Sequence, residues 1–153
     1  MLLSEVFLKL GDEDFASFVR GVSLGKLRTY QMYESFKTRA RLHKLNTESL
    51  RHSIPRFRER LADKDEEFAK DLAQAILLSH LDLILAVLDF LKIPNQNGFF
   101  DKDLDASAYL TPGWQQRVYD QFHGKLPEIP LLFYINHLAW ELDKTAGCFP
   151  PSA

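Results

Sequence analysis

Apolar residues recur along the chain with a period near 3.6, and no stretch shows sustained alternation of apolar and polar residues. This spacing gathers apolar side chains on one side of a helix, which is typical of amphipathic helices that share a core. The pattern therefore predicts an all-α fold, a compact bundle of about six or seven helices.

Capping residues and helix breakers divide this pattern into segments. Pro55 lies inside one of them, and we expect a kink or a break into two short pieces there, because proline removes a backbone donor. Between 95 and 110 the chain is expected to be irregular, with a turn at Asn97-Gly98. The expected helices cover about 3–10, 12–21, 24–45, 48–61, 64–92, 112–122 and 130–144.

The segment Lys64 to Lys92 has the widest apolar side and is predicted to be one long central helix, opened by a capping box of Asp63 and Glu66. A helix with so wide an apolar side usually forms the core around which the others pack. The predicted core side consists of Phe68, Leu72, Ile76, Leu83, Ile84, Val87, Phe90 and Leu91. Asp82 and Asp89 in this segment argue against a membrane span, so a soluble protein is expected.

Length and cysteine content set the expected class. The 153 residues suit one domain, predicted over 1–146, with a flexible C-terminal tail over 147–153. Cys148 is the single cysteine, so no disulfide within the chain and no cysteine cluster for a metal is expected. The N-terminal residues do not have the pattern of a signal peptide. Together these features favour a reducing, cytoplasmic compartment.

Charge is concentrated in one part of the chain. Residues 20–60 contain 11 Lys and Arg against three Glu, although the whole chain has a net charge of −2. Tyr30, His43 and His52 are interleaved with these basic residues. The candidate basic face consists of Arg28, Lys37, Arg39, Arg41, Lys44, Arg51, Arg56, Arg58 and Arg60; Arg20 and Lys26 precede it.

This basic segment allows two interpretations. It could follow a nucleic-acid backbone or meet an acidic partner, or its arginines could pair with carboxylates such as Asp65 and Glu67 of the adjoining helix. A pI near 6.2 falls short of the strongly basic domain expected of a dedicated nucleic-acid binder. A face open to water would favour nucleic acid, and a face neutralised by carboxylates would favour a protein partner.

Two further places carry polar or aromatic residues that packing alone would not select. On a continuous helix His80 lies between Ile76 and Ile84, which makes it a buried polar candidate, either a functional imidazole or a core residue satisfied by a carbonyl or hydroxyl. In the last helix four residues lie away from the core stripe and are candidates for binding a partner. They are Phe133, Asn136, His137 and Trp140.

The four residues of the last helix suggest a symmetric homodimer contact or, alternatively, an internal helix packed on two sides. Known enzyme motifs are absent from the sequence, and Asp101, Asp103 and Asp105 lack the glycine and glutamate of a calcium loop. No cofactor, metal or catalytic residue is therefore expected.

The most favoured function is a non-catalytic helical interaction module, an adaptor or regulatory protein that binds another protein or a second copy of itself. The first alternative is a nucleic-acid-binding accessory protein that uses residues 20–60. The second alternative is an enzyme or small-molecule binder centred on His80 or His137.

Overall fold

The computed structural model describes residues 2–101 and 103–151, and every regular element in these ranges is a helix. Nine α-helices and one short 3-10 helix are present there, so the predicted all-α class is confirmed. The expected number of six or seven helices was too low. Two long helices that were expected are each divided into two, as described below.

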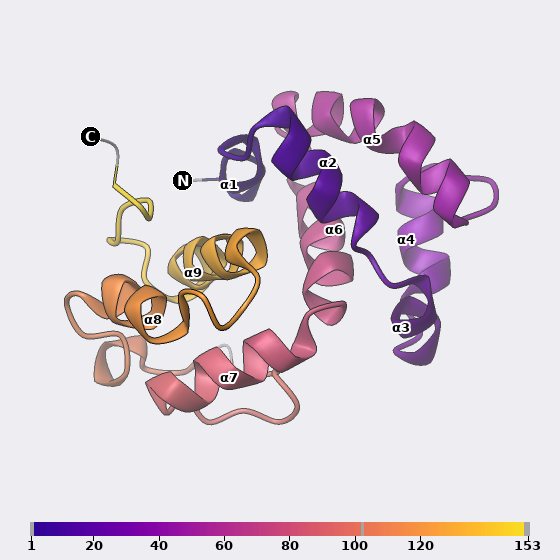
Figure 1. Ribbon diagram of the computed structural model, residues 1–153. Helices are drawn as coiled ribbons and strands as arrows, with labels where there is room; N and C mark the ends of the chain where they lie inside the picture. The colour runs from indigo at the N-terminus through magenta and orange to yellow at the C-terminus, as the bar shows by residue number, and fades with distance from the viewer. Residues whose placement is uncertain (1, 102, 152–153) are drawn as a thin grey trace. The chain divides into compact units, whose positions relative to one another are not determined.

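The contacts divide the chain into two compact units, Met1–Ser79 and His80–Ala153, and each unit is described by itself (Figure 1). Unit 1 contains α1 (Leu3–Leu8), α2 (Asp12–Arg20), α3 (Leu24–Thr29), α4 (Tyr33–Arg39), α5 (Thr47–Ala62) and α6 (Glu66–Leu78). Unit 2 contains α7 (Leu81–Leu91), η1 (Ala106–Ala108), α8 (Trp114–Phe122) and α9 (Glu128–Leu142). The single domain over 1–146 stays a prediction.

Unit 1 is built around α5 and α6. Helix α5 packs against α1, α2 and α6, and α6 also packs against α1, α3 and α4. Three phenylalanines from different helices form the centre of this core, with 6.3 Å between the ring centroids of Phe36 and Phe57 and 5.0 Å between those of Phe57 and Phe68. All three side chains are buried, and burial of aromatic rings of this size is a large source of stability.

The short helix α1 is held by a carboxylate of α6. Glu66 accepts hydrogen bonds from the backbone N–H groups of Leu3 at 2.7 Å and Ser4 at 3.0 Å. These are two of the first four N–H groups of α1, which have no partner within the helix. The negative charge also suits the positive end of a helix dipole. Glu66 therefore joins the beginning of α6 to the beginning of α1.

Several helices end at residues that the sequence did not mark as breakers. Gln31, Arg41, Lys64 and Lys92 all have φ between 58° and 62°, the left-handed conformation in which glycine usually ends a helix. In each case the N–H of the next residue donates back to a carbonyl five residues earlier in the chain. These bonds are Met32 to Leu27, Leu42 to Lys37, Asp65 to Arg60, and Ile93 to Leu88.

The prediction of one long helix over 24–45 is therefore wrong. Gln31 ends the turn after α3 and Arg41 ends the turn after α4, so two short helices replace one. Met32 and Leu42, which follow these residues, are partly buried apolar side chains, and an apolar residue at this position commonly accompanies this type of helix end.

The predicted central helix over Lys64–Lys92 is also wrong, because it consists of α6 and α7 with a break at Ser79-His80. The Ser79 hydroxyl donates to the Ala75 carbonyl at 3.1 Å and accepts from the N–H of Ser23 at 2.7 Å. A serine hydroxyl that binds the backbone of its own helix competes with continued helix. The cap of α6 is Asp65, not Asp63, because its carboxylate accepts from the N–H of Phe68.

Two proline positions also differ from expectation. Helix α5 is continuous through Pro55, so of the expected kink or break the break is wrong. Pro55 and Arg51 are both exposed, and water can satisfy the Arg51 carbonyl that loses its donor. Helix α8 begins at Trp114 rather than at Pro112, with Gly113 at φ 85° as its cap.

Unit 2 combines a partly irregular segment with two packed helices. Helix α8 packs against α7 and α9, and the rings of Phe90 and Phe122 lie 5.7 Å apart. The expected turn at Asn97-Gly98 is present, with both residues at positive φ between the bridged residues Gln96 and Phe99. A side chain at Gly98 would lie 3.2 Å from Ile84, which also favours glycine here.

In the part of the chain that the structure describes, no single helix is long and apolar enough to cross a membrane. Only α6 and α7 taken together, with the break between them, reach the required length and composition.

Most of the predicted core side is buried although it is divided between two helices. Phe90 is the exception at 37% exposed, because it lies at the surface of α7, where its ring contacts Phe122. Phe68, Leu72, Ile76, Ile84 and Val87 are at most 6% exposed. We expect Ile76→Ala to lower the free energy of unfolding by about 2–5 kcal/mol, because it removes a fully buried branched side chain. Urea denaturation measures this change, with Gln74→Ala on the exposed side of α6 as the matched control. A loss below about 0.5 kcal/mol, the range of surface substitutions, would contradict burial of Ile76.

Candidate functional site

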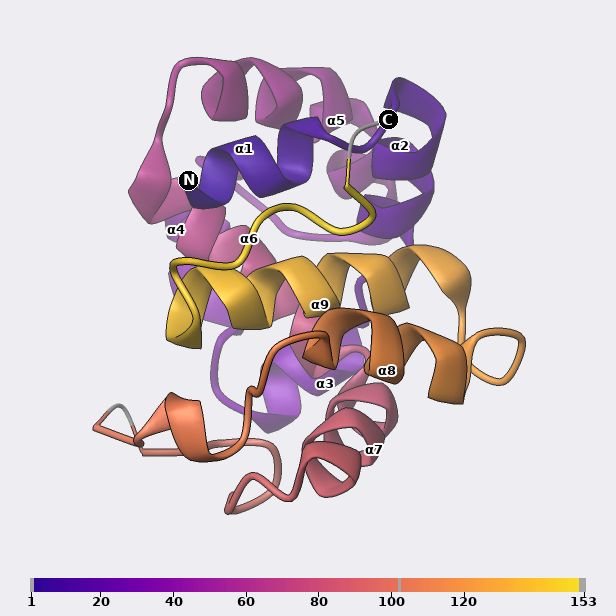
Figure 2. The same cartoon turned by 90° about the vertical axis from the view of Figure 1, so that its left-hand side faces the viewer.

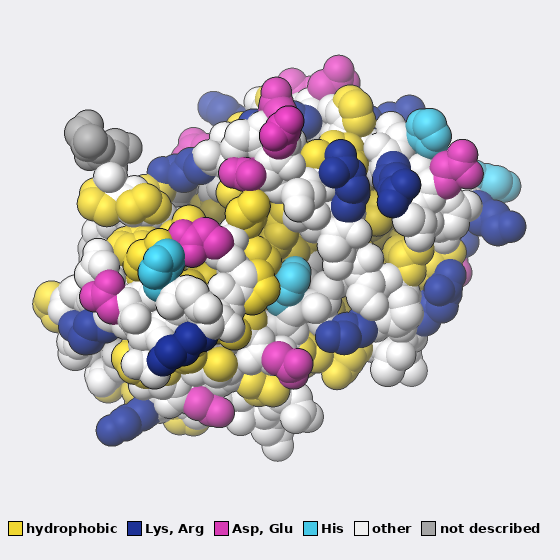
Figure 3. Space-filling model, viewed as in Figure 1, with side chains coloured by type: hydrophobic (Ala, Val, Ile, Leu, Met, Phe, Trp, Pro, Cys, Tyr) yellow, Lys and Arg dark blue, Asp and Glu magenta, His cyan; other side chains and the backbone are white. Residues whose placement is uncertain are grey.

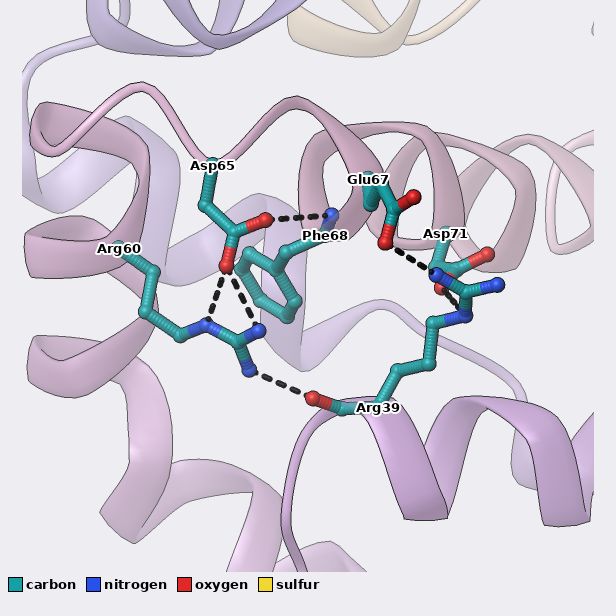
Figure 4. A network of polar contacts seen from close by, with 6 residues as sticks. All are labelled: Arg39, Arg60, Asp65, Glu67, Phe68 and Asp71. Carbon is teal, nitrogen blue, oxygen red and sulfur yellow. Dashed lines mark hydrogen bonds and ion pairs between the residues drawn. The ribbon is translucent and has the colours of Figure 1, made fainter.

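The guanidinium of Arg60 connects three helices of unit 1 (Figure 4). Its Nε and Nη2 donate to Asp65 Oδ2 at 3.0 and 2.7 Å, and its Nη1 donates to the Arg39 carbonyl at 2.6 Å. The same guanidinium lies 4.3 Å from the centroid of the Phe68 ring. Burial opposes ionisation of Asp65, but the Phe68 N–H and Arg60 together lower its pKa below the ordinary value. Asp65 is therefore a charged cap fixed by Arg60.

Arg39 makes the second part of this network (Figure 4). Its Nη1 donates to Glu67 Oε2 at 3.1 Å, and its Nε lies 2.7 Å from Asp71 Oδ2. Burial raises the pKa of Asp71, and the nearby Arg39 opposes that rise. Arg39 thus compensates a carboxylate that is otherwise costly to keep ionised at this position.

Other members of the candidate basic face also have partners within unit 1. Arg58 donates to the Leu10 carbonyl at 2.7 Å, lies 3.3 Å from an Asp12 oxygen and packs over the ring of Phe15. Lys37 pairs with Glu34 at 2.9 Å, and Arg28 lies over the ring of Tyr33. Arg41 contributes favourable charge to Asp65.

Five basic candidates are exposed and form no ion pair with the residues that the structure describes. They are Arg28, Arg41, Lys44, Arg51 and Arg56. Glu48 and Glu59 are also exposed along α5. On the face seen in Figure 3, basic and acidic side chains are interspersed over α2 and α5. The structure therefore does not bring the nine basic candidates together on one continuous face.

His80 has a different position from the one predicted. It is the residue before α7, with φ −125° and ψ 40°, and it is partly exposed. Its carbonyl accepts from the N–H of Ile84, as the first carbonyl of the helix. The predicted position within a buried helix side was wrong because α6 ends at Leu78. His80 is a boundary residue between two helices.

Helix α9 holds the four residues predicted to bind a partner. It begins at Glu128, two residues before the expected start. Pro130 therefore lies in the first turn, where backbone N–H groups have no acceptor within the helix, so a proline there removes no hydrogen bond. Phe133, Asn136 and His137 are 2%, 6% and 9% exposed, and Trp140 is partly exposed. This burial fits the alternative interpretation of a helix packed on more than one side. Their role in partner binding stays a prediction, and Trp140 has the most accessible surface of the four.

His137 is an aromatic residue among aromatic neighbours. Its ring lies 6.2 Å from the ring of Tyr134 and 5.5 Å from that of Trp140. The Glu141 carboxylate is 3.6 Å from Nδ1, beyond a hydrogen bond, and Nδ1 has no hydrogen-bond partner among the described residues. Burial lowers the pKa of His137 from 6.5 to about 4. The imidazole is therefore neutral at physiological pH.

Asn136 holds the C-terminal segment. Its Nδ2 donates to the Phe149 carbonyl at 2.7 Å, and its Oδ1 accepts from the Phe149 N–H at 2.8 Å. Phe149 is 8% exposed and its ring lies 5.5 Å from that of Tyr119 in α8. Asn136 was predicted as a candidate, whereas Phe149 was expected to lie in a flexible tail. A bulky aromatic residue near the end of the chain was the signal in the sequence that could have indicated this contact. The flexibility of 147–153 stays a prediction, and 152–153 lie outside the described residues.

A half-open cleft of about 510 Å³ lies beside α8 and the end of α9. Asp143 accepts a hydrogen bond from Trp114 Nε1 at 3.0 Å and one from the Thr145 hydroxyl at 2.9 Å. The nearby Ser107 hydroxyl donates to Asp105, which caps η1. The polar groups of the cleft are thus largely engaged with one another. Among the described residues, no group of three His, Cys, Asp or Glu side chains could hold a metal ion.

No protein-family model matches the chain, and neither a curated protein nor a solved structure is significantly similar to it.

The first prediction from this geometry concerns Arg39. We expect Arg39→Gln to lower the free energy of unfolding by about 1 kcal/mol at neutral pH, because Asp71 loses its charged partner in a partly buried position. The pKa of Asp71 should also rise further. Urea denaturation and a carboxyl NMR titration measure the two effects. Arg56→Gln, an exposed arginine of α5, is the matched control; equal stability of both variants would show that the pair contributes nothing.

The second prediction concerns pH. The unfolded chain takes up a proton at His137 near pH 6.5, whereas the folded chain does so only near pH 4. Stability from neutral His137 is therefore present above pH 6.5 and is lost as the pH falls toward 4, by up to about 3 kcal/mol. Urea denaturation between pH 7 and 4 should show a smaller loss for His137→Leu than for the wild type. His52→Leu is the exposed control, and identical losses in all three proteins would contradict a neutral, buried His137.

Proposed function

We propose that this chain is a non-catalytic protein-interaction module with an adaptor or regulatory role. The observation that supports it is the pairing of Arg39, Arg58 and Arg60 with carboxylates and carbonyls of their own unit. These groups stabilise the fold, and a phosphate backbone would have to compete with their present partners. A single cysteine suits action in a reducing, cytoplasmic compartment.

The surface that remains has mixed charge. Lys44, Arg51 and Arg56 are available to a partner, and Glu48 and Glu59 are exposed along the same helix, α5. Acidic groups among the basic ones repel phosphates, whereas a protein partner can complement both signs at once. The mixed surface therefore favours a protein over a nucleic acid. The partner is another protein or a second copy of this chain.

Nucleic-acid binding is the alternative, and salt dependence separates it from protein binding. If residues 20–60 contacted phosphates, affinity would fall steeply with salt because each neutralised phosphate releases counterions. We expect the purified chain to show no such binding to labelled single- or double-stranded oligonucleotides by fluorescence anisotropy, even at low salt. Binding that is lost in a Lys44→Glu, Arg51→Glu, Arg56→Glu variant would establish the alternative instead.

The protein partner is tested by affinity purification from the native host. Retention of the same proteins from nuclease-treated and untreated lysates supports the proposal, and loss of every protein after nuclease treatment contradicts it. Sedimentation equilibrium of the purified chain, compared with Trp140→Glu, distinguishes self-association from a different partner. A wild-type dimer that becomes a folded monomer on substitution would identify the second copy as the partner.

A further inference from the structure

The contact between Asn136 and Phe149 has the geometry of a bound peptide. Figure 2 shows the C-terminal segment running beside α9. One side-chain amide pairs with both the N–H and the carbonyl of a single residue, at 2.8 and 2.7 Å. Asn136 therefore recognises backbone, and its hydrogen bonds do not depend on which side chain the bound residue carries.

The specificity of the site comes from the ring of Phe149. That ring is buried and lies 5.5 Å from the ring of Tyr119, in a tilted arrangement. Pro150 and Pro151 follow and are exposed. Prolines have no N–H and a restricted φ, so a segment of this kind has little conformational freedom to lose when it binds. The resident segment thus combines one aromatic anchor with a stiff continuation.

The attachment of the segment is local. Gly147 is exposed, and its carbonyl accepts one hydrogen bond from Gln115 at 3.1 Å. On either side of Phe149 the neighbouring residues are exposed or only partly buried. A single deeply buried residue therefore carries most of the contact. A chain segment held in this way can leave its site without unfolding the helices that form it.

We propose that Asn136 of α9, together with the ring of Tyr119 in α8, is a peptide-docking site. Its ligand is a segment of a partner protein in which an aromatic residue precedes proline. The chain's own Phe149 segment shows the chemistry that fits, and it competes with the partner for the site. This inference rests on the proposed function, because it names the part of the interaction module that the partner occupies.

The test uses a fluorescent peptide of residues 147–151 carrying Cys148→Ser, and the full chain as receptor. In the Phe149→Ala chain the resident aromatic anchor is gone, so the peptide should bind at least about tenfold more tightly than to the wild type. Methylation of the peptide nitrogen of its Phe149 residue removes the N–H that Asn136 accepts, and should weaken binding about tenfold. A chain with both Phe149→Ala and Asn136→Asp should bind the peptide about tenfold more weakly than the Phe149→Ala chain, because aspartate keeps the oxygen acceptor but loses the N–H donor.

Circular dichroism establishes that each variant is folded. If Phe149→Ala does not fold, the wild-type chain is titrated with the peptide instead, and the side-chain amide resonances of Asn136 should shift at millimolar peptide. A folded Phe149→Ala chain that binds no peptide overturns the inference, as does equal binding of the N-methylated peptide or unmoved Asn136 resonances. These failures leave the affinity purification unaffected, so they are distinguishable from failure of the proposed function.

Discussion

The guanidinium of Arg60 lies where three helices of unit 1 meet. It binds Asp65, which caps α6, and the Arg39 carbonyl, which is among the last of α4, while its plane covers the ring of Phe68. The Arg39 carbonyl is at the end of α4, where a carbonyl has no donor within the helix. The Asp65 carboxylate is stabilised by the positive charge of the guanidinium beside it. Because these ends are fixed, Phe36, Phe57 and Phe68 can meet in one core.

This structural role of arginine decides how the basic segment can be used. Side chains that hold helix ends and compensate Asp71 are engaged within the unit, so they supply little free positive charge. The charge that remains is shared among a few exposed residues interspersed with glutamates. In unit 2 the corresponding constraint is burial: His137 is kept neutral, and Asn136 forms hydrogen bonds with the backbone of Phe149.

Much of the fold could be predicted from local pattern. The 3.6-residue period determined the helical class, and the buried side of α6 and α7 was identified correctly from Phe68 to Val87. Local turn chemistry was also predicted correctly, as at Asn97-Gly98. These features depend on neighbours within a few residues, so the sequence contains the whole of their physical cause.

The remaining features depend on groups far apart in the chain. The break after Leu78 involves Ser23, 56 residues before Ser79, and the cap of α1 is Glu66. Non-glycine helix ends such as those at Gln31 and Arg41 have no distinctive composition, because packing of the following residue compensates the left-handed conformation. The candidate site shows the same division: the sequence identified Asn136 as a polar residue away from the core stripe. Only the tertiary structure brought Phe149 to it, because hydrogen bonds between distant residues require the packed helices that align them.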